Sequence, residues 1–123
     1  MMKITGKYDD NVGVKDMSKR MNEYPHVFIK ACGEKLIPGT MNFIVGRRVR
    51  IKEDFRIHGI DIDEPRQDLL FEKCLLNGKP AFRIRPLNLD NGLGGHGDHI
   101  LEISSAHEFT DLDSNENHEI TFF

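Results

Sequence analysis

Thr40 and Asn42 are the first residues of this chain whose types and spacing could do chemistry, and they follow a Pro38-Gly39 turn. Residues two apart on a β-strand point to the same face, so the hydroxyl and the carboxamide would lie side by side. Neutral oxygen ligands of this kind suit a hard cation that also carries phosphate. The same side chains could instead satisfy backbone groups of the turn, and spacing alone favours this plainer interpretation.

Glu102 is the second candidate. It lies in the sequence Ile-Leu-Glu-Ile-Ser at residues 100–104, where alternation places it on the face opposite Leu101 and Ile103. Its carboxylate is either solvated or accepts hydrogen bonds from a polar ligand in a barrel mouth, and the pattern alone leaves both interpretations open.

A glycine-rich segment at residues 91–99 contains His96, Asp98 and His99. These three could hold a transition metal only with a further ligand from elsewhere in the chain. The segment precedes a predicted strand and does not open a helix, so it does not match a phosphate-binding glycine loop. No Ser-His-Asp order or nucleophile elbow is present, and the sequence assigns no catalytic residue.

The elements that must position these residues are mostly short strands. Pro25 is suited to the first turn of a second helix and Gly33 to a helix end, which predicts one or two helices over 15–32. Asn77-Gly78 predicts a hairpin, and the strand after it is predicted to turn Phe82 and Ile84 inward. Strands are predicted at 2–8, 40–45, 48–57, 69–76, 81–85, 100–104 and 119–123, with at most one helical turn at 108–112.

This order predicts a mainly β fold, a small β-barrel with one or two short helices inserted after the first strand. The 123 residues form one predicted domain, 1–123, with 38% hydrophobic and 30% charged residues. A net charge of −3 gives no electrostatic footprint for nucleic acid, and no apolar run is long enough to span a membrane. Cys32 and Cys74 follow no metal spacing, so we expect buried thiols and a reducing, cytoplasmic setting.

The order of these pieces resembles the archaeal-type CTP-dependent riboflavin kinases, which are small barrels of the cradle-loop kind. Residues 38–42 are similar to that family's Gly-Thr-Leu-Asn turn, and residues 100–104 are similar to its Ile-Glu-Ile-Ile-Ala strand. The resemblance extends over nearly the whole chain and includes Thr5-Gly6, Tyr24, Phe28 and Gly33.

The resemblance implies a specific site and reaction. Thr40 and Asn42 would hold Mg²⁺ on the nucleotide phosphates, and Glu102 would bind the flavin side. The reaction would transfer the γ-phosphoryl group of CTP to the ribityl hydroxyl of riboflavin, giving FMN and CDP. Magnesium and good alignment would then do most of the catalysis.

Two segments depart from the family pattern and support an alternative. The family's early glycine loop corresponds to residues 11–15, where only Gly13 is left as a nucleotide-binding candidate. After the late strand, residues 105–110 lack the family's Pro and Arg. Each charged hydrogen bond lost would weaken triphosphate binding by about 1.5–3 kcal/mol. The alternative is a non-catalytic module on the same barrel, for small-molecule binding or for interaction.

Overall fold

The computed structural model describes residues 1–9, 15–87, 97–110, 112 and 116–123. Its elements in chain order are β1 (Met2–Tyr8), α1 (Lys15–Glu23), α2 (Pro25–Cys32), β2 (Met41–Val45), β3 (Phe55–Ile57), the 3₁₀ turn η1 (Gly59–Ile62), β4 (Leu69–Leu76), β5 (Lys79–Pro86), β6 (Ile100–Ser104) and β7 (Asn117–Phe122).

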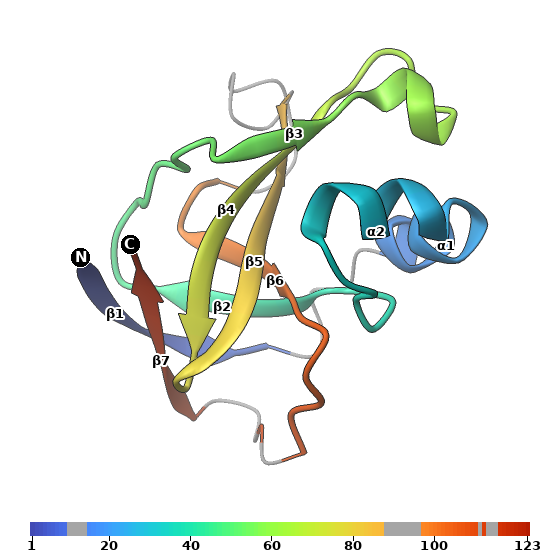
Figure 1. The fold of residues 1–123 in the computed structure, drawn as a ribbon. Coiled ribbons are helices and arrows are strands. Elements are labelled where there is room, and N and C mark those ends of the chain that lie inside the picture. Colours follow the sequence, from blue (N-terminus) through green and yellow to red (C-terminus); the bar gives the residue numbers. More distant parts are fainter. Residues whose placement is uncertain (10–14, 88–96, 111, 113–115) are drawn as a thin grey trace.

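Six of the strands form a closed antiparallel barrel, in the order β4-β5-β6-β2-β1-β7, and β7 pairs again with β4. Strand β3 pairs with the first part of β4 and lies outside this ring. Figure 1 shows the two helices packed against one side of the barrel, with the ends of the chain together on the opposite side. The predicted fold class, a small β-barrel with short helices after the first strand, is therefore confirmed.

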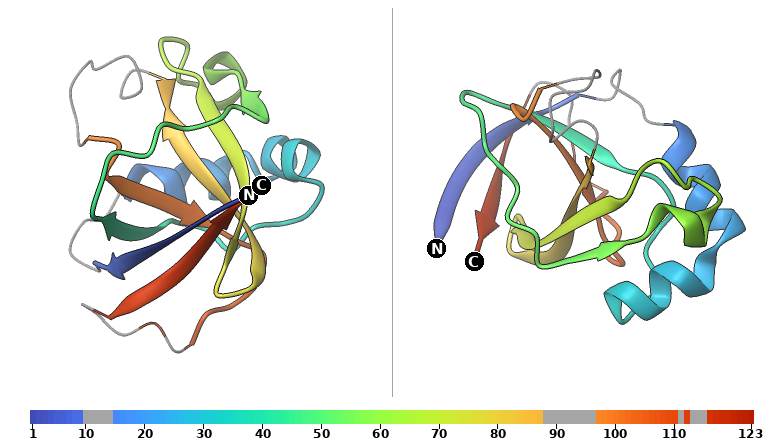
Figure 2. Two further views of the ribbon diagram at one scale, coloured as in Figure 1. Left: turned by 90° about the vertical axis from the view of Figure 1, so that its left-hand side faces the viewer. Right: turned by 90° about the horizontal axis from the view of Figure 1, so that it is seen from above.

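The segment between β1 and β2 forms two helices, and α2 begins at Pro25 as the sequence predicted. Pro25 begins α2, at a position where its missing N–H would have no partner in the helix. Gly33 ends α2 with a φ of 80°, and its N–H donates to the carbonyl of Ile29 at 2.8 Å. The two helices therefore form a compact pair, seen from two further directions in Figure 2.

The β4–β5 hairpin also agrees with its sequence signal. Asn77 and Gly78 have φ values of 50° and 83°, the left-handed conformations that a tight two-residue hairpin turn requires. This turn sets the register of both strands, from Leu76 opposite Lys79 to Leu69 opposite Pro86.

Apolar side chains form two separate cores. One fills the barrel and contains Phe43, Val45, Val49, Cys74, Leu76, Ala81, Leu101, Ile103, Ile120 and Phe122. The other lies between the barrel wall and the helices and contains Met17, Met21, Phe28, Leu36, Ile57, Ile62, Leu69, Phe71, Phe82 and Ile84. Strands β4 and β5 therefore bury both of their faces, as strands do when helices cover a sheet.

Two sequence predictions fail here. Phe82 and Ile84 are buried, but they face the helices, and alternation turns Arg83 and Arg85 toward the barrel interior instead. The predicted strand over 48–57 is present only as β3, although Val49 and Ile51 are buried. Before β3 the backbone makes isolated hydrogen bonds, such as the one that the N–H of Val49 donates to the carbonyl of Asp98.

Smaller predictions can be compared directly. Residues 108–110 are not helical, which agrees with the limit of one turn. Both cysteines are free thiols; Cys74 is buried as predicted, whereas Cys32 is partly exposed. Loss of hydration raises the pKa of each to about 12. None of the helices in the described ranges is long and apolar enough to cross a membrane.

Candidate functional site

Asn42 and Glu102 are direct partners across the antiparallel β2–β6 ladder. Both side chains are almost fully buried, with exposed fractions of 3% and 2%. Residues directly opposite in such a ladder have Cβ atoms about 4.5–5.5 Å apart, so the amide and the carboxylate are close neighbours. Two of the predicted site residues, 60 positions apart in the sequence, are therefore brought together.

The pair lies on the outside of the barrel wall. Phe43 and Leu101, which neighbour Asn42 and Glu102 in their strands, belong to the core inside the barrel. Alternation therefore turns Asn42 and Glu102 outward, and Glu102 is the register partner of Ile84, which packs beneath the helices. The predicted position of Glu102 in a barrel mouth is therefore wrong, because Glu102 lies on this outer face.

Thr40 is held next to the pair by a well-anchored turn. Gly39 has a φ of 106°, which a residue with a Cβ rarely adopts. The hydroxyl of Ser104 donates to the carbonyl of Gly39 at 2.9 Å, and the N–H of Gly39 donates to the sulfur of Met21 at 3.3 Å. The turn is thereby attached to both β6 and α1, and Thr40 follows it directly.

A cavity of about 200 Å³ opens beside this turn. It is lined by Ile37, Pro38, Gly39, Thr40, Met41, Ser104, Ser105, His107, Glu108 and Phe109. Thr40 lines this cavity, but Asn42 and Glu102 are not among its lining residues. Asn42 and Glu102 thus share one face of the sheet, whereas Thr40 precedes β2 and lines a cavity that they do not line.

The oxygens of Thr40 and Asn42 fit a hard cation. Thr40 Oγ1 and Asn42 Oδ1 are both buried, and neither has a hydrogen-bond partner within the described part of the chain. Leaving a buried polar atom without a partner costs about 1–3 kcal/mol. A cation that prefers oxygen ligands, such as Mg²⁺, would offset this cost, and the carboxylate of Glu102 next to Asn42 would add negative charge.

The remaining sequence candidates do not add to this site. Gly13 and His96 lie outside the described residues. Asp98 binds Arg48, whose Nε donates to Asp98 Oδ1 at 2.7 Å and lowers the pKa of that carboxyl. Across the residues that the structure describes, no three His, Cys, Asp or Glu side chains are grouped so that they could hold a metal ion.

The sequence prediction missed a charged pair inside the barrel. Glu72 and Arg83 are register partners, both are buried, and both point into the barrel with Cys74 and Ala81. Burial raises the pKa of Glu72, while a hydrogen bond from the N–H of Lys52 and the charge of Arg83 oppose that rise. The Asn77-Gly78 turn could have predicted this pairing, because its register places residues 72 and 83 opposite each other.

No protein-family model matches this chain, and a search of curated proteins finds no match either.

Proposed function

We propose that this protein is a riboflavin-kinase-like barrel that binds a magnesium nucleotide and a flavin around the Asn42–Glu102 pair. The proposed reaction transfers the γ-phosphoryl group of CTP to the ribityl hydroxyl of riboflavin, giving FMN and CDP. The observation that carries the proposal is the pair of buried oxygens, Thr40 Oγ1 and Asn42 Oδ1, beside a buried carboxylate from another strand. These are the residues for which the sequence resemblance implies these roles.

Each residue has a distinct part in the proposed reaction. The oxygens of Thr40 and Asn42 would hold the cation, which when bound neutralises charge on the phosphate oxygens. Glu102 would accept a hydrogen bond from the flavin side and orient it. The ribityl oxygen forms a bond to the γ-phosphorus, the bond from that phosphorus to the CDP oxygen breaks, and the hydroxyl proton is released. Because phosphoryl transfer depends mainly on alignment, the doubly anchored turn before Thr40 supports this role.

One observation favours the alternative, a binding module without catalysis. Glu108 is exposed and lines the same cavity as Thr40, and the segment 105–110 contains no arginine. A carboxylate in this place would repel a triphosphate and would not stabilise charge during transfer. Such a cavity would accept an uncharged or singly phosphorylated ligand more readily than CTP.

Turnover separates the two functions. The purified protein is incubated with riboflavin, CTP and Mg²⁺, and FMN and CDP are quantified by chromatography. Formation of both products in equal amounts, and its loss when EDTA is added, is expected for the kinase. Binding of riboflavin detected by fluorescence without any FMN would favour the binding module. Absence of both turnover and riboflavin binding would exclude the kinase and a riboflavin-binding module.

The site assignment has its own variants. The double variant T40A/N42A is expected to lose Mg²⁺-dependent turnover or binding, because it removes both neutral oxygens. The matched control is Thr5→Ala, which removes an exposed hydroxyl from β1 and should behave as the unmodified protein. If T40A/N42A retains its Mg²⁺ dependence, the cation binds elsewhere.

A further inference from the structure

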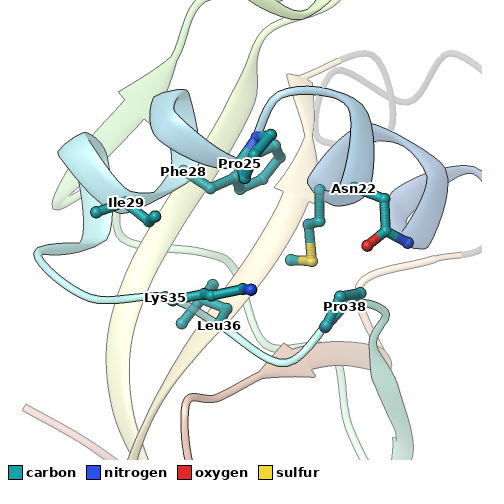
Figure 3. Close-up of a pocket in the computed structure, with 8 residues that line it drawn as sticks. Asn22, Pro25, Phe28, Ile29, Lys35, Leu36 and Pro38 are labelled. Carbon is teal, nitrogen blue, oxygen red and sulfur yellow. The ribbon is translucent and has the colours of Figure 1, made fainter.

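A second cavity, of about 110 Å³, lies between the two helices and the segment that leads from α2 to β2. Figure 3 shows the side chains around it, with those of α1 and α2 above and those of the connecting segment below. Its lining residues are Met21, Asn22, Pro25, Phe28, Ile29, Lys35, Leu36 and Pro38. Apart from Pro38, none of these lines the cavity beside Thr40.

The cavity combines an apolar floor with polar groups at its rim. Phe28 and Leu36 are deeply buried, with exposed fractions of 2% and 4%, whereas Ile29 at the rim is 40% exposed. In Figure 3 the amino group of Lys35 points across the opening toward Pro38, and the amide of Asn22 lies on the α1 side. Lys35 forms no ion pair with any other residue that the structure describes.

We propose that this cavity binds a small apolar monocarboxylate, such as an aromatic or short branched-chain acid. The hydrocarbon part would contact Phe28 and Leu36, and the carboxylate would bind the Lys35 amino group, with the Asn22 amide within the same rim. Binding sites for small molecules usually pair apolar walls with a few polar groups that fix orientation. A closed cavity of about 150 Å³ holds benzene, so this one has room for part of a ring whose charged end stays at the rim.

The cavity is connected to the turn before Thr40. Met21 lines it, and the sulfur of Met21 accepts the N–H of Gly39 at 3.3 Å. Pro38, the residue before Gly39, lines both cavities. A ligand that contacts Met21 therefore changes the environment of the Gly39 amide, whether or not the chain is a kinase.

Benzoate is the probe for this proposal, and ¹H–¹⁵N NMR of the full chain is the measurement. We expect saturable shifts centred on residues 21–29 and 35–39, including the Gly39 amide, with a dissociation constant on the order of a few millimolar. Benzyl alcohol, which has the ring without the charge, is expected to bind about three- to fivefold more weakly.

Two variants test the contacts. Lys35→Gln is expected to weaken benzoate binding about three- to fivefold and to leave benzyl alcohol binding unchanged. Lys30→Gln, in α2 but outside this cavity, is expected to leave both unchanged. Ile29→Glu places a carboxylate at the exposed rim and should abolish benzoate binding without unfolding the chain. Absence of saturable shifts, shifts elsewhere, or equal effects of K35Q and K30Q would overturn the proposal.

Discussion

The side-chain nitrogen of Asn77 lies 3.1 Å from Nδ1 of His118, and this contact connects the β4–β5 hairpin turn to β7. The carbonyl oxygen of the same amide accepts the N–H of Glu119 at 2.9 Å, so its NH₂ group must face the histidine. Nδ1 of His118 is therefore the acceptor, and in the neutral ring the proton is on Nε2. That ring is buried against Tyr8 and Phe43.

Replacing Asn77 with alanine is expected to destabilise the barrel by about 2 kcal/mol. The change removes both side-chain bonds and places a Cβ without a local hydrogen bond at a φ of 50°. Urea unfolding measures the loss. Asn77→Gly keeps the turn conformation and should cost less than Asn77→Ala, and equal costs would show that backbone strain has no part in the effect.

Replacing either Glu72 or Arg83 alone is expected to destabilise the barrel by about 1–3 kcal/mol, because the remaining buried charge loses the opposite charge of its register partner. The double variant E72L/R83M replaces both with apolar side chains and should be much more stable than the two single losses added together. A double-mutant cycle in urea gives the coupling. Additive losses would mean that the two charges do not stabilise each other.

Asp68 is expected to make the fold acid-sensitive. Its pKa is lowered, first by the hydrogen bond from the Gly59 N–H and then by Arg56 and His58. The stabilisation is therefore complete above the ordinary carboxyl pKa of 3.8 and is lost as the pH falls through the lower folded value. Asp68→Asn should lower the urea midpoint at pH 7 and flatten its decline below about pH 4, unlike the exposed control Asp63→Asn.

Asn42→Ala should separate ligand binding from stability. Its side-chain oxygen has no hydrogen-bond partner in the described ranges, so we expect only a small change in the melting temperature of the protein alone. The increase in melting temperature produced by Mg²⁺ with CDP should disappear, whereas Thr5→Ala should retain it. A large loss of stability without ligand would instead give Asn42 a structural role.

Both thiols are expected to be unreactive in the folded protein. A pKa of about 12 leaves Cys32 and Cys74 protonated at pH 8, and the thiolate is the reactive form. Ellman's reagent should therefore react slowly with the native chain and rapidly in urea. Because Cys32 is partly exposed, rapid labelling of native Cys74→Ser protein would show that its raised pKa does not keep it unreactive.

Strands with a clear end signal were predicted with their exact bounds. Leu69–Leu76 ends at an Asn-Gly turn, and Ile100–Ser104 alternates regularly. The strand prediction was wrong for the segment before β3. Val49 and Ile51 are buried there, but this segment is not part of a strand, and an alternating pattern indicates burial without showing that a strand pairs. Phe82 and Ile84 were assigned to the wrong side because β5 is covered on both faces, so one strand alone does not reveal which face is the barrel interior.

The candidate site was predictable only in part. Local alternation predicts that Thr40 and Asn42 share a face, but the closeness of Asn42 and Glu102 depends on the β2–β6 register. Register between distant strands depends on how the whole barrel closes, and no local pattern encodes it. The cavity beneath the helices likewise depends on how α1 and α2 dock, which the apolar spacing of each helix does not specify.

Met2 and Phe122 are register partners at one end of the β1–β7 ladder, so the two ends of this chain lie side by side. A short peptide bridge could therefore join residue 1 to residue 123 and close the backbone into a ring with both strands in place. Cutting the chain at the exposed Asn77-Gly78 turn would then give a circular permutant with the same order of strands around the barrel. In that permutant β4 and β5 would come at opposite ends of the chain, so their pairing would join residues far apart in the sequence.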